Sequence, residues 1–321
     1  MVEIKASRDD EQRRLDRILR KFSPDTPLSR IYSLLRKGKI LVNGKKASAD
    51  HASRRVMAGD VIAVPDELSA ARNSATRNRA SEASAVPPYL RSRIVFENDD
   101  LLVVNKSAGV AVHGGGFPQK QRNLAEMVES YLVGTIPHSL SFKPGPLHRL
   151  DQPTSGLVMF SKNLAGARLF TALIRERKIV KRYLALVDGR IERADMWRDD
   201  LVRNSAKRKT FVAEDKGAGS SASRQAETSV EPIASNAAHS LVLMEIHTGR
   251  THQIRSQSAL RGHPLAGDKK YGGSFLETGL LLHAYSLEFP PETGLPVLTA
   301  PLPPAFRQFI EDRHWRHKLL E

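Results

Sequence analysis

The chain has 321 residues, of which 40% are hydrophobic and 26% are charged. This balance excludes a collagen, a mucin and a wholly disordered chain, and the length predicts more than one domain. Fifty Lys and Arg against 35 Asp and Glu give a net charge of +15. Such an excess favours a polyanionic partner, and a nucleic acid is a better candidate than an acidic membrane surface.

Cysteine is absent, which excludes disulfides and thiolate zinc sites. Residues 1–5 have none of the apolar core that a signal peptide requires. The longest apolar runs, 101–104 and 280–282, are far shorter than the ~20 residues needed to span a bilayer. We therefore expect a cytoplasmic protein that has no membrane partner.

The positive charge is concentrated in residues 13–55, which hold thirteen Lys or Arg against three Asp, a net charge of +10. Apolar residues at helical spacing predict two short helices in this segment, and a strand at 40–42 leads into a tight turn at Asn43-Gly44. The basic side chains fall opposite the apolar stripes and form one exposed face. That face is either an RNA-binding surface or the solvated face of a small αβ unit.

The same segment resembles an S4-type RNA-binding domain, most specifically in the core Arg-Lys-Gly-Lys-Ile-Leu-Val-Asn-Gly at 36–44. The resemblance implies that residues 1–65 form a small domain that holds structured RNA. We expect its RNA contacts to come from five basic residues, namely Arg30, Arg36, Lys37, Lys39 and Lys45.

Residues 66–92 are rich in Ala, Ser, Arg and Asn and show no repeated apolar face, which predicts a flexible linker. A weakly amphipathic helix over part of it is the alternative. Residues 93–321 mix strands and helices without regular βαβ order. They predict an α+β domain on a mixed, largely antiparallel sheet with flanking helices. The polar stretch 217–224 is either a hairpin tip or a disordered insertion.

Several segments of this domain could carry chemistry. The residues His148-Arg149-Leu150-Asp151 precede a proline, in a loop that could present the aspartate at the rim of the sheet. The simpler alternative is that the aspartate accepts backbone hydrogen bonds in its own turn. The segment 247–263 places basic side chains around a helix start, which favours anions. Its histidines match no zinc spacing, so we expect no metal.

Four motifs in order resemble the RluA branch of the RNA pseudouridine synthases over residues 94–309. They are His-Arg-Leu-Asp-x-x-Thr-Ser-Gly at 148–156, Lys-x-Tyr at 181–183, Gly-Arg-x-His-Gln-Ile-Arg at 249–255 and Leu-His-Ala at 282–284. With the S4-type segment in front, the resemblance is strongest to members that modify large-subunit ribosomal RNA.

This resemblance implies an isomerase that converts uridines of 23S ribosomal RNA to pseudouridine. The N1–C1′ bond breaks and C5 joins C1′, so no cofactor is needed. The expected partner is ribosomal RNA, and we expect the protein to be a monomer. The alternatives are a transfer RNA or another ribosomal stem-loop as substrate, or a non-catalytic RNA-binding or ribosome-assembly factor.

The resemblance also implies residue roles. Asp151 is the catalytic carboxylate, acting on the ribose either as a nucleophile at C1′ or as a base at C2′. Arg255 pairs with Asp151, and a planar two-point contact explains why arginine is preferred to lysine there. Tyr183 lies beside the uracil, with proton exchange at C5 left open as a second role. Further substrate contacts are expected from Leu282, His148, Arg149, Arg250 and His252.

Two departures from the family pattern are visible. Residues 105–113 resemble an Asn-Lys-Pro segment of the family but have Ser107 in place of the proline. We expect this segment to be structural, with Lys106 and His113 near the RNA. Gln152-Pro153 follow the aspartate where the family commonly has an acidic residue, and the proline should stiffen the loop.

Overall fold

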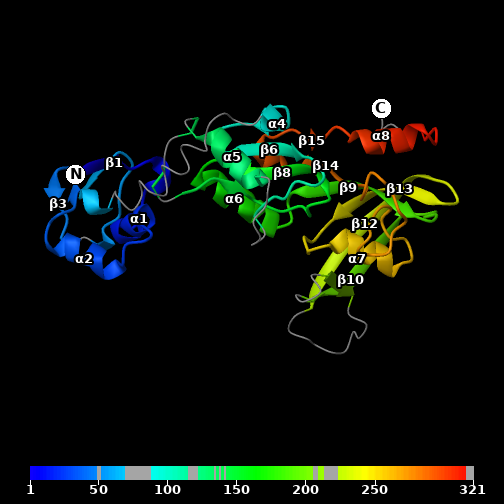
Figure 1. The fold of residues 1–321 in the computed structure, drawn as a ribbon, viewed down its shortest axis with the longest axis horizontal. Coiled ribbons are helices and arrows are strands. Elements are labelled where there is room, and N and C mark those ends of the chain that lie inside the picture. Colours follow the sequence, from blue (N-terminus) through cyan, green and yellow to red (C-terminus); the bar gives the residue numbers. More distant parts are fainter. Residues whose placement is uncertain are drawn as a thin grey trace.

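A computed structural model describes residues 1–48, 52–68, 88–114, 122–133, 135–136, 139–140, 142–204, 209–212 and 223–315. Figure 1 shows a small N-terminal unit at one end of an elongated molecule, followed by a long sheet that extends towards the C-terminal helix. The predicted α+β fold is confirmed. In the described ranges, no helix has the length and apolar character needed to cross a membrane.

The N-terminal unit, residues 1–68, has a four-stranded sheet in the order β1-β4-β2-β3. Both predicted helices are confirmed, and Asn43 and Gly44 form the predicted turn with φ angles of 53° and 75°. The first strand was not predicted, because only Ile4 of its four residues is buried. The elements are β1 (Val2–Lys5), η1 (Arg8–Asp10), α1 (Leu15–Phe22), α2 (Leu28–Arg36), β2 (Leu41–Val42), β3 (Lys45–Lys46) and β4 (Val61–Val64).

Two neighbouring carboxylates connect the N-terminal unit to the larger unit, residues 88–315. Asp9 accepts the N–H of Leu164, in the first turn of α6 (Leu164–Arg175), at 2.9 Å. Asp10 accepts the Ser139 hydroxyl at 3.0 Å and the Leu140 N–H at 3.1 Å. Leu140 is buried in the hydrophobic core of the N-terminal unit, so the two units share an interface.

The segment 66–92, predicted as a linker, contributes to both hydrophobic cores. Leu68 is buried in the N-terminal core, and Leu90, on α4 (Pro88–Arg91), is buried in the core of the larger unit. The interval between the two cores is therefore shorter than predicted, and residues 69–87 lie outside the described ranges. So does most of the polar stretch 217–224, whose last residue begins a strand.

The larger unit is built on one eleven-stranded sheet within the described residues. Its main path is β11-β10-β12-β13-β9-β14-β8-β6-β5, with β15 paired to β14 and β7 paired to β8. Every pairing is antiparallel except β14 with β8. The strands are β5 (Ile94–Glu97), β6 (Leu101–Lys106), β7 (Gly145–Pro146), β8 (Ser155–Ser161), β9 (Val180–Asp188), β10 (Asp195–Asn204), β11 (Lys209–Val212), β12 (Arg224–Ser235), β13 (His239–Ile246), β14 (Leu282–Glu288) and β15 (Leu298–Thr299).

Helices cover both faces of this sheet around β8, all seven residues of which are buried. Val158 and Phe160 belong to the core shared with α5, whereas Leu157 and Met159 belong to the core shared with α6. Because side chains alternate along a strand, burial on both faces requires this continuous apolar run. The remaining helices are α5 (Leu124–Leu132), α7 (Gln253–Leu260), η3 (Pro291–Thr293) and α8 (Pro304–Glu311).

The parallel pairing of β8 with β14 depends on Gly156. Its φ is 111°, and a Cβ at this position would lie 2.2 Å from the carbonyl oxygen of Ala284. The close approach holds Ser155 opposite His283 and Gly156 opposite Ala284. As a result, the loop that precedes β8 lies beside the start of β14, and residues more than 120 positions apart in the sequence meet there.

We expect Gly156→Ala to lower the free energy of unfolding by more than about 2 kcal/mol, because the new methyl group both strains the backbone and clashes with β14. Urea unfolding measures this difference. Gly294→Ala is the matched control, since Gly294 also has a positive φ, 64°, but a Cβ there would meet nothing within 4 Å. Equal losses in the two variants would contradict the role given to the β8–β14 contact.

Candidate active site

An open pocket of about 70 Å³ lies where the loop before β8 meets β9, β14 and the start of α7. Seven of the eight residues predicted to act on or bind the substrate line it, and His148 is the exception. The lining residues are Arg149, Leu150, Asp151, Thr154, Tyr183, Ile246, Arg250, His252, Gln253, Ile254, Arg255 and Leu282. The ordered motifs of the sequence therefore converge on one place in the fold.

Asp151 and Arg255 are in direct contact in this pocket. Nη1 of Arg255 donates to Oδ2 of Asp151 at 3.0 Å. The Asp151 side chain is 23% exposed, whereas that of Arg255 is 7% exposed. The carboxylate is thus accessible from the pocket while its guanidinium partner is buried.

The expected two-point contact exists, but with a different carboxylate. Nε and Nη2 of Arg255 donate to the two oxygens of Asp268 at 2.7 and 2.8 Å. Asp151 therefore receives only one N–H bond, which corrects the prediction. The reason is geometric: a guanidinium offers five N–H groups in a fixed plane, and the edge that faces Asp268 cannot also face Asp151. Burial opposes the charge of Arg255, but hydrogen bonds and charge from Asp268 and Asp151 outweigh it and raise the Arg255 pKa.

Asp268 was not predicted as a site residue, although a sequence signal was present in Gly-Asp-Lys-Lys-Tyr-Gly-Gly at 267–273. The turn is tight, because a Cβ on Gly267 would lie 2.0 Å from the carbonyl oxygen of Gly279. The N–H of Lys270 donates to Oδ1 of Asp268 at 3.1 Å. Asp268 itself is 2% exposed. The turn thus fixes a buried carboxylate beneath Arg255.

Tyr183 and Leu282 form an apolar wall of the pocket. Tyr183 is on β9, opposite Ala284 of β14, and Leu282 begins β14 opposite Ala185. Both side chains are buried, at 7% and 4% exposure. Burial and the nearby charge of Asp151 raise the pKa of Tyr183, so its hydroxyl stays protonated at neutral pH.

His252 connects Asp151 with a tyrosine. It precedes α7 in the left-handed conformation, with a φ of 56°. Its Nδ1 is 2.9 Å from the hydroxyl of Tyr271, and its Nε2 is 3.6 Å from Oδ2 of Asp151. Burial lowers the pKa of His252, and the charge of Asp151 opposes that effect in part.

Lys106, expected near the RNA, is instead fully buried at the end of β6. Its Nζ donates to the carbonyl oxygens of Ser107, Val110 and Gln152 at 3.1, 2.8 and 3.1 Å. Burial lowers its pKa to about 8. Because Gln152 follows Asp151, the lysine fixes the backbone of the loop that carries the carboxylate. His113, which is also expected near the RNA, is exposed.

His148 does not line the pocket, so its predicted role in binding substrate is not supported by its position. Its Nε2 accepts the backbone N–H of Met159 in β8 at 3.1 Å. Burial, and then the positive charge of Lys181, lower its pKa to about 3, which keeps the ring neutral and able to accept this bond. This hydrogen bond with Met159 indicates that His148 belongs to the packing between β7 and β8.

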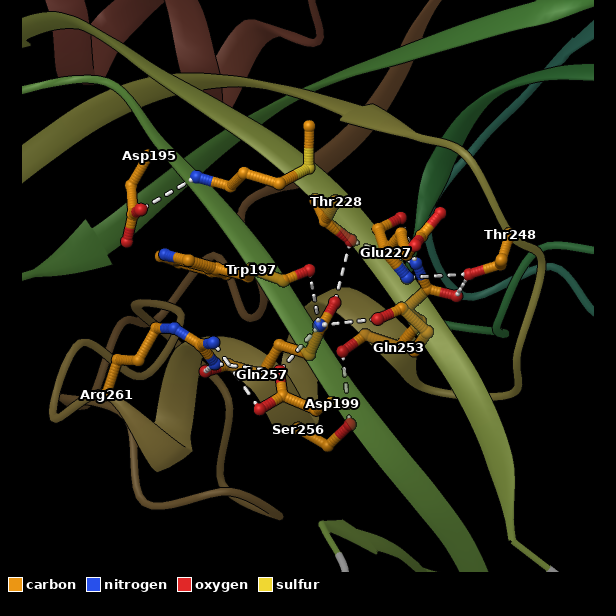
Figure 2. Close-up of polar contacts among 12 residues, drawn as sticks. Asp195, Trp197, Asp199, Glu227, Thr228, Thr248, Gln253, Ser256, Gln257 and Arg261 are labelled. Atoms are coloured by element: carbon orange, nitrogen blue, oxygen red, sulfur yellow. Dashed lines mark hydrogen bonds and ion pairs between the residues drawn. The ribbon is translucent and has the colours of Figure 1, made fainter. Parts of the chain in front are cut away.

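The helix that carries Arg255 is attached to the sheet through buried polar groups (Figure 2). Nε2 of Gln253 donates to the Thr228 hydroxyl at 2.9 Å, and that hydroxyl donates to Gln257 at 2.7 Å. Nε2 of Gln257 in turn donates to Asp199 at 2.7 Å, and Arg261 donates to the same carboxylate at 2.9 Å. These bonds fix the rotation of α7 against β10 and β12. Gln253 belongs to the motif at 249–255, and Arg261 is one of the basic residues of the segment 247–263. Thr228, Gln257 and Asp199 were not singled out from the sequence.

Figure 1 places the N-terminal unit at the end of the molecule opposite α8. All five of its predicted RNA-contacting residues are exposed. Four of them lie around the end of α2 and the β2–β3 hairpin, namely Arg36, Lys37, Lys39 and Lys45. Arg30 is also exposed and pairs with Glu67 at 2.5 Å. Among the described residues, no group of three or more His, Asp or Glu side chains is arranged to hold a metal ion.

Comparisons with known proteins identify the family of this chain. The sequence matches the RNA pseudouridylate synthase family over residues 100–260. The ribosomal large subunit pseudouridine synthase C of Escherichia coli (strain K12) is 32% identical over 307 residues, which cover 89% of this chain and 88% of that protein. The protein of the same name from Pasteurella multocida (strain Pm70) is 31% identical over 331 residues, covering 95% and 91%.

Solved structures give the same result. Human RNA pseudouridylate synthase domain containing 1 is 26% identical, with a TM-score of 0.53 over 66% of this chain and 83% of that chain. Human RNA pseudouridylate synthase domain containing 4 shares the fold, with 20% identity and a TM-score of 0.60 over 74% of this chain and 99% of that chain. From its sequence match, its relatives and its fold, this chain belongs to the RNA pseudouridylate synthase family.

Proposed function

We propose that this enzyme converts specific uridines of large-subunit ribosomal RNA to pseudouridine, with Asp151 acting on the ribose. The contact of Asp151 with the buried Arg255, at the mouth of a pocket walled by Tyr183, is the observation that carries the proposal. The substrate is inferred from relatives that are 31–32% identical and named for the large ribosomal subunit. Ribosomal RNA as substrate also makes the bacterial cytoplasm the expected location.

The two carboxylate oxygens of Asp151 differ in their hydrogen bonding. Oδ2 accepts the N–H of Arg255, whereas Oδ1 has no hydrogen-bond partner among the described residues. Oδ1 is therefore the oxygen that can approach the ribose, as a nucleophile at C1′ or as a base at C2′. The single bond from Arg255 orients the carboxylate and leaves one oxygen free to react.

The wall of the pocket suits an extruded uracil. Extracting a base from its stack costs a few kcal/mol, and contact with an aromatic ring such as Tyr183 recovers part of that. Leu282 and Ile246 close the pocket with apolar surface, so a uracil detached from C1′ is retained and can turn to present C5. Arg149 and Arg250 at the rim supply positive charge for the neighbouring phosphates.

The exposed basic residues of the N-terminal unit are proposed to hold RNA in the manner of an S4-type domain. Cations that face solvent on one surface attract phosphates and release counterions on binding. The proposal separates two tasks: the N-terminal unit, residues 1–65, supplies affinity, and the larger unit supplies chemistry.

We expect Asp151→Asn to abolish pseudouridine formation while RNA affinity stays within about two-fold, because the amide keeps the shape but cannot attack or deprotonate the ribose. Mapping pseudouridine in ribosomal RNA from cells with the wild-type gene, the variant or no gene measures the first effect. Asp200→Asn, an exposed aspartate outside the pocket, is the control. Full modification by the Asp151 variant contradicts the mechanism.

Arg255→Lys should slow single-turnover pseudouridine formation by roughly 10²-fold, because a small misplacement of a reacting group has that effect. A lysine keeps the charge but cannot donate at two points to Asp268 and at a third to Asp151. Rapid-quench kinetics with saturating enzyme measure the rate, and filter binding measures RNA affinity, which should not change. A variant that loses affinity but reacts at the normal rate once bound would contradict the orienting role.

Replacing Lys37, Lys39 and Lys45 together by Gln should weaken RNA binding and reduce the slope of log Kd against log salt by up to about three. The reaction rate of the bound complex should be unchanged. The control replaces three exposed cations on and after α6, namely Arg168, Arg175 and Lys178. If both triple variants lose the same RNA affinity, the N-terminal cations contribute only general electrostatic attraction, and their proposed role as the RNA-binding surface is contradicted.

A further inference from the structure

The hydroxyl of Tyr271 determines which nitrogen of His252 carries a hydrogen. This hydroxyl accepts the backbone N–H of Thr210 at 2.9 Å and donates to the carbonyl oxygen of Thr210 at 3.1 Å. A phenol has one hydrogen, so its third contact, with Nδ1 of His252 at 2.9 Å, must be donated by the histidine. Nδ1 therefore bears the hydrogen, and Nε2 carries the lone pair.

The position of Thr210 makes this arrangement stable. Thr210 is on β11, the last strand of the sheet, and is 3% exposed. Its N–H and C=O both contact the hydroxyl of Tyr271. Leaving such a buried group unpaired is unfavourable, so the tyrosine hydrogen is held by Thr210 and does not turn towards His252.

Nε2 of His252 lies beside Asp151 at the pocket. His252 lines it, and Nε2 is 3.6 Å from Oδ2 of Asp151. Burial lowers the pKa of His252, which keeps the ring neutral, while the charge of Asp151 favours a proton there. The other charged groups near the ring are Arg255 from α7 and Lys270 and Asp268 from the turn.

The other groups of the pocket are poorer proton acceptors. Tyr183 keeps its proton, because burial and Asp151 raise its pKa. Arg149, Arg250 and Arg255 are cations. Apart from the carboxylate of Asp151, which accepts an N–H of Arg255, His252 is therefore the basic side chain of the pocket. The protonated state of Tyr183 argues against the proton exchange at C5 that the sequence left open as a second role of this tyrosine.

We propose, resting on the proposed function, that Nε2 of His252 accepts the proton that leaves C5 of the uracil after C5 has bonded to C1′. At that stage C5 carries both hydrogen and C1′, and N1 is double-bonded to C6. The C5–H bond breaks and the Nε2–H bond forms. The electron pair left on C5 makes the C5=C6 double bond, and the C6=N1 pair moves to N1, which takes a proton from water.

The imidazolium formed in this step is stabilised by the carboxylate of Asp151, which is free again once C1′ has bonded to C5. The imidazolium then returns its proton to water. One proton thus moves from C5 to N1 by way of solvent, and the enzyme is restored. No oxidant, metal or co-reactant is consumed.

The test is His252→Asn, because asparagine places an N–H near the position of Nδ1 and tolerates the left-handed backbone, but lacks Nε2. With RNA that carries 5-deuterouridine, the variant should show a primary isotope effect well above that of wild type. Its single-turnover rate should fall at least roughly 10²-fold. The decline of the wild-type rate at acid pH, where His252 is protonated, should also disappear. His314→Asn, at an exposed histidine with a φ of 52°, is the control.

An isotope effect in His252→Asn no larger than in wild type would overturn the proposal, whatever the rate. A second measurement needs no activity: ¹⁵N spectra of histidine-labelled protein should show His252 with hydrogen on Nδ1, and hydrogen on Nε2 alone would overturn it. The isotope experiment needs only a uridine RNA that the enzyme isomerises. Inactivity on large-subunit RNA would therefore contradict the proposed substrate and not the role of His252.

Discussion

The burial of one guanidinium is the constraint on which the rest of the site depends. Arg255 is 6% exposed, and a buried charge without partners is strongly destabilising. Two carboxylates offset it, and each has a different task. Asp268, almost fully buried, holds the plane of the guanidinium from one edge. Asp151, which is partly exposed, takes the remaining N–H and faces the pocket. The exposed end of this charge arrangement is therefore the one that a substrate can reach, whereas its buried end is structural.

This arrangement explains features of the fold that packing alone does not. A helix that docked through apolar side chains could rotate slightly without penalty, whereas α7 is attached by buried amide and hydroxyl groups whose partners are specific. The rotation of α7 sets the direction of Arg255, so the polar attachment of Gln253 and Gln257 defines the geometry of its contact with Asp151. On the other side of the pocket, Gly156 and Lys106 do the same for the loop that carries Asp151.

The sequence predicted the parts of the site that lie in short ordered motifs, and missed those that depend on tertiary contacts. Each of four residues that lie together in one pocket belongs to a recognisable motif, namely Asp151, Tyr183, Arg255 and Leu282. Asp268 was missed because its pairing depends on how a glycine-rich turn folds back beneath α7. Strand β10 was missed because charged residues interrupt its apolar alternation, Asp-Met-Trp-Arg-Asp-Asp-Leu-Val-Arg-Asn. Lys106 was misplaced because a lysine is ordinarily at the surface, and only the fold shows three carbonyl groups around it.

The distribution of charge follows from the same constraint. Inside the pocket, two carboxylates balance the buried Arg255, whereas Arg149 and Arg250 leave positive charge at its rim. The net positive charge is instead concentrated in residues 13–55, whose basic side chains include the exposed cations at the end of α2 and the β2–β3 hairpin. Screening by salt acts on exposed charges much more than on buried pairs. Salt therefore weakens the attraction of these exposed cations for a polyanion much more than it weakens the buried pair of Arg255 and Asp268.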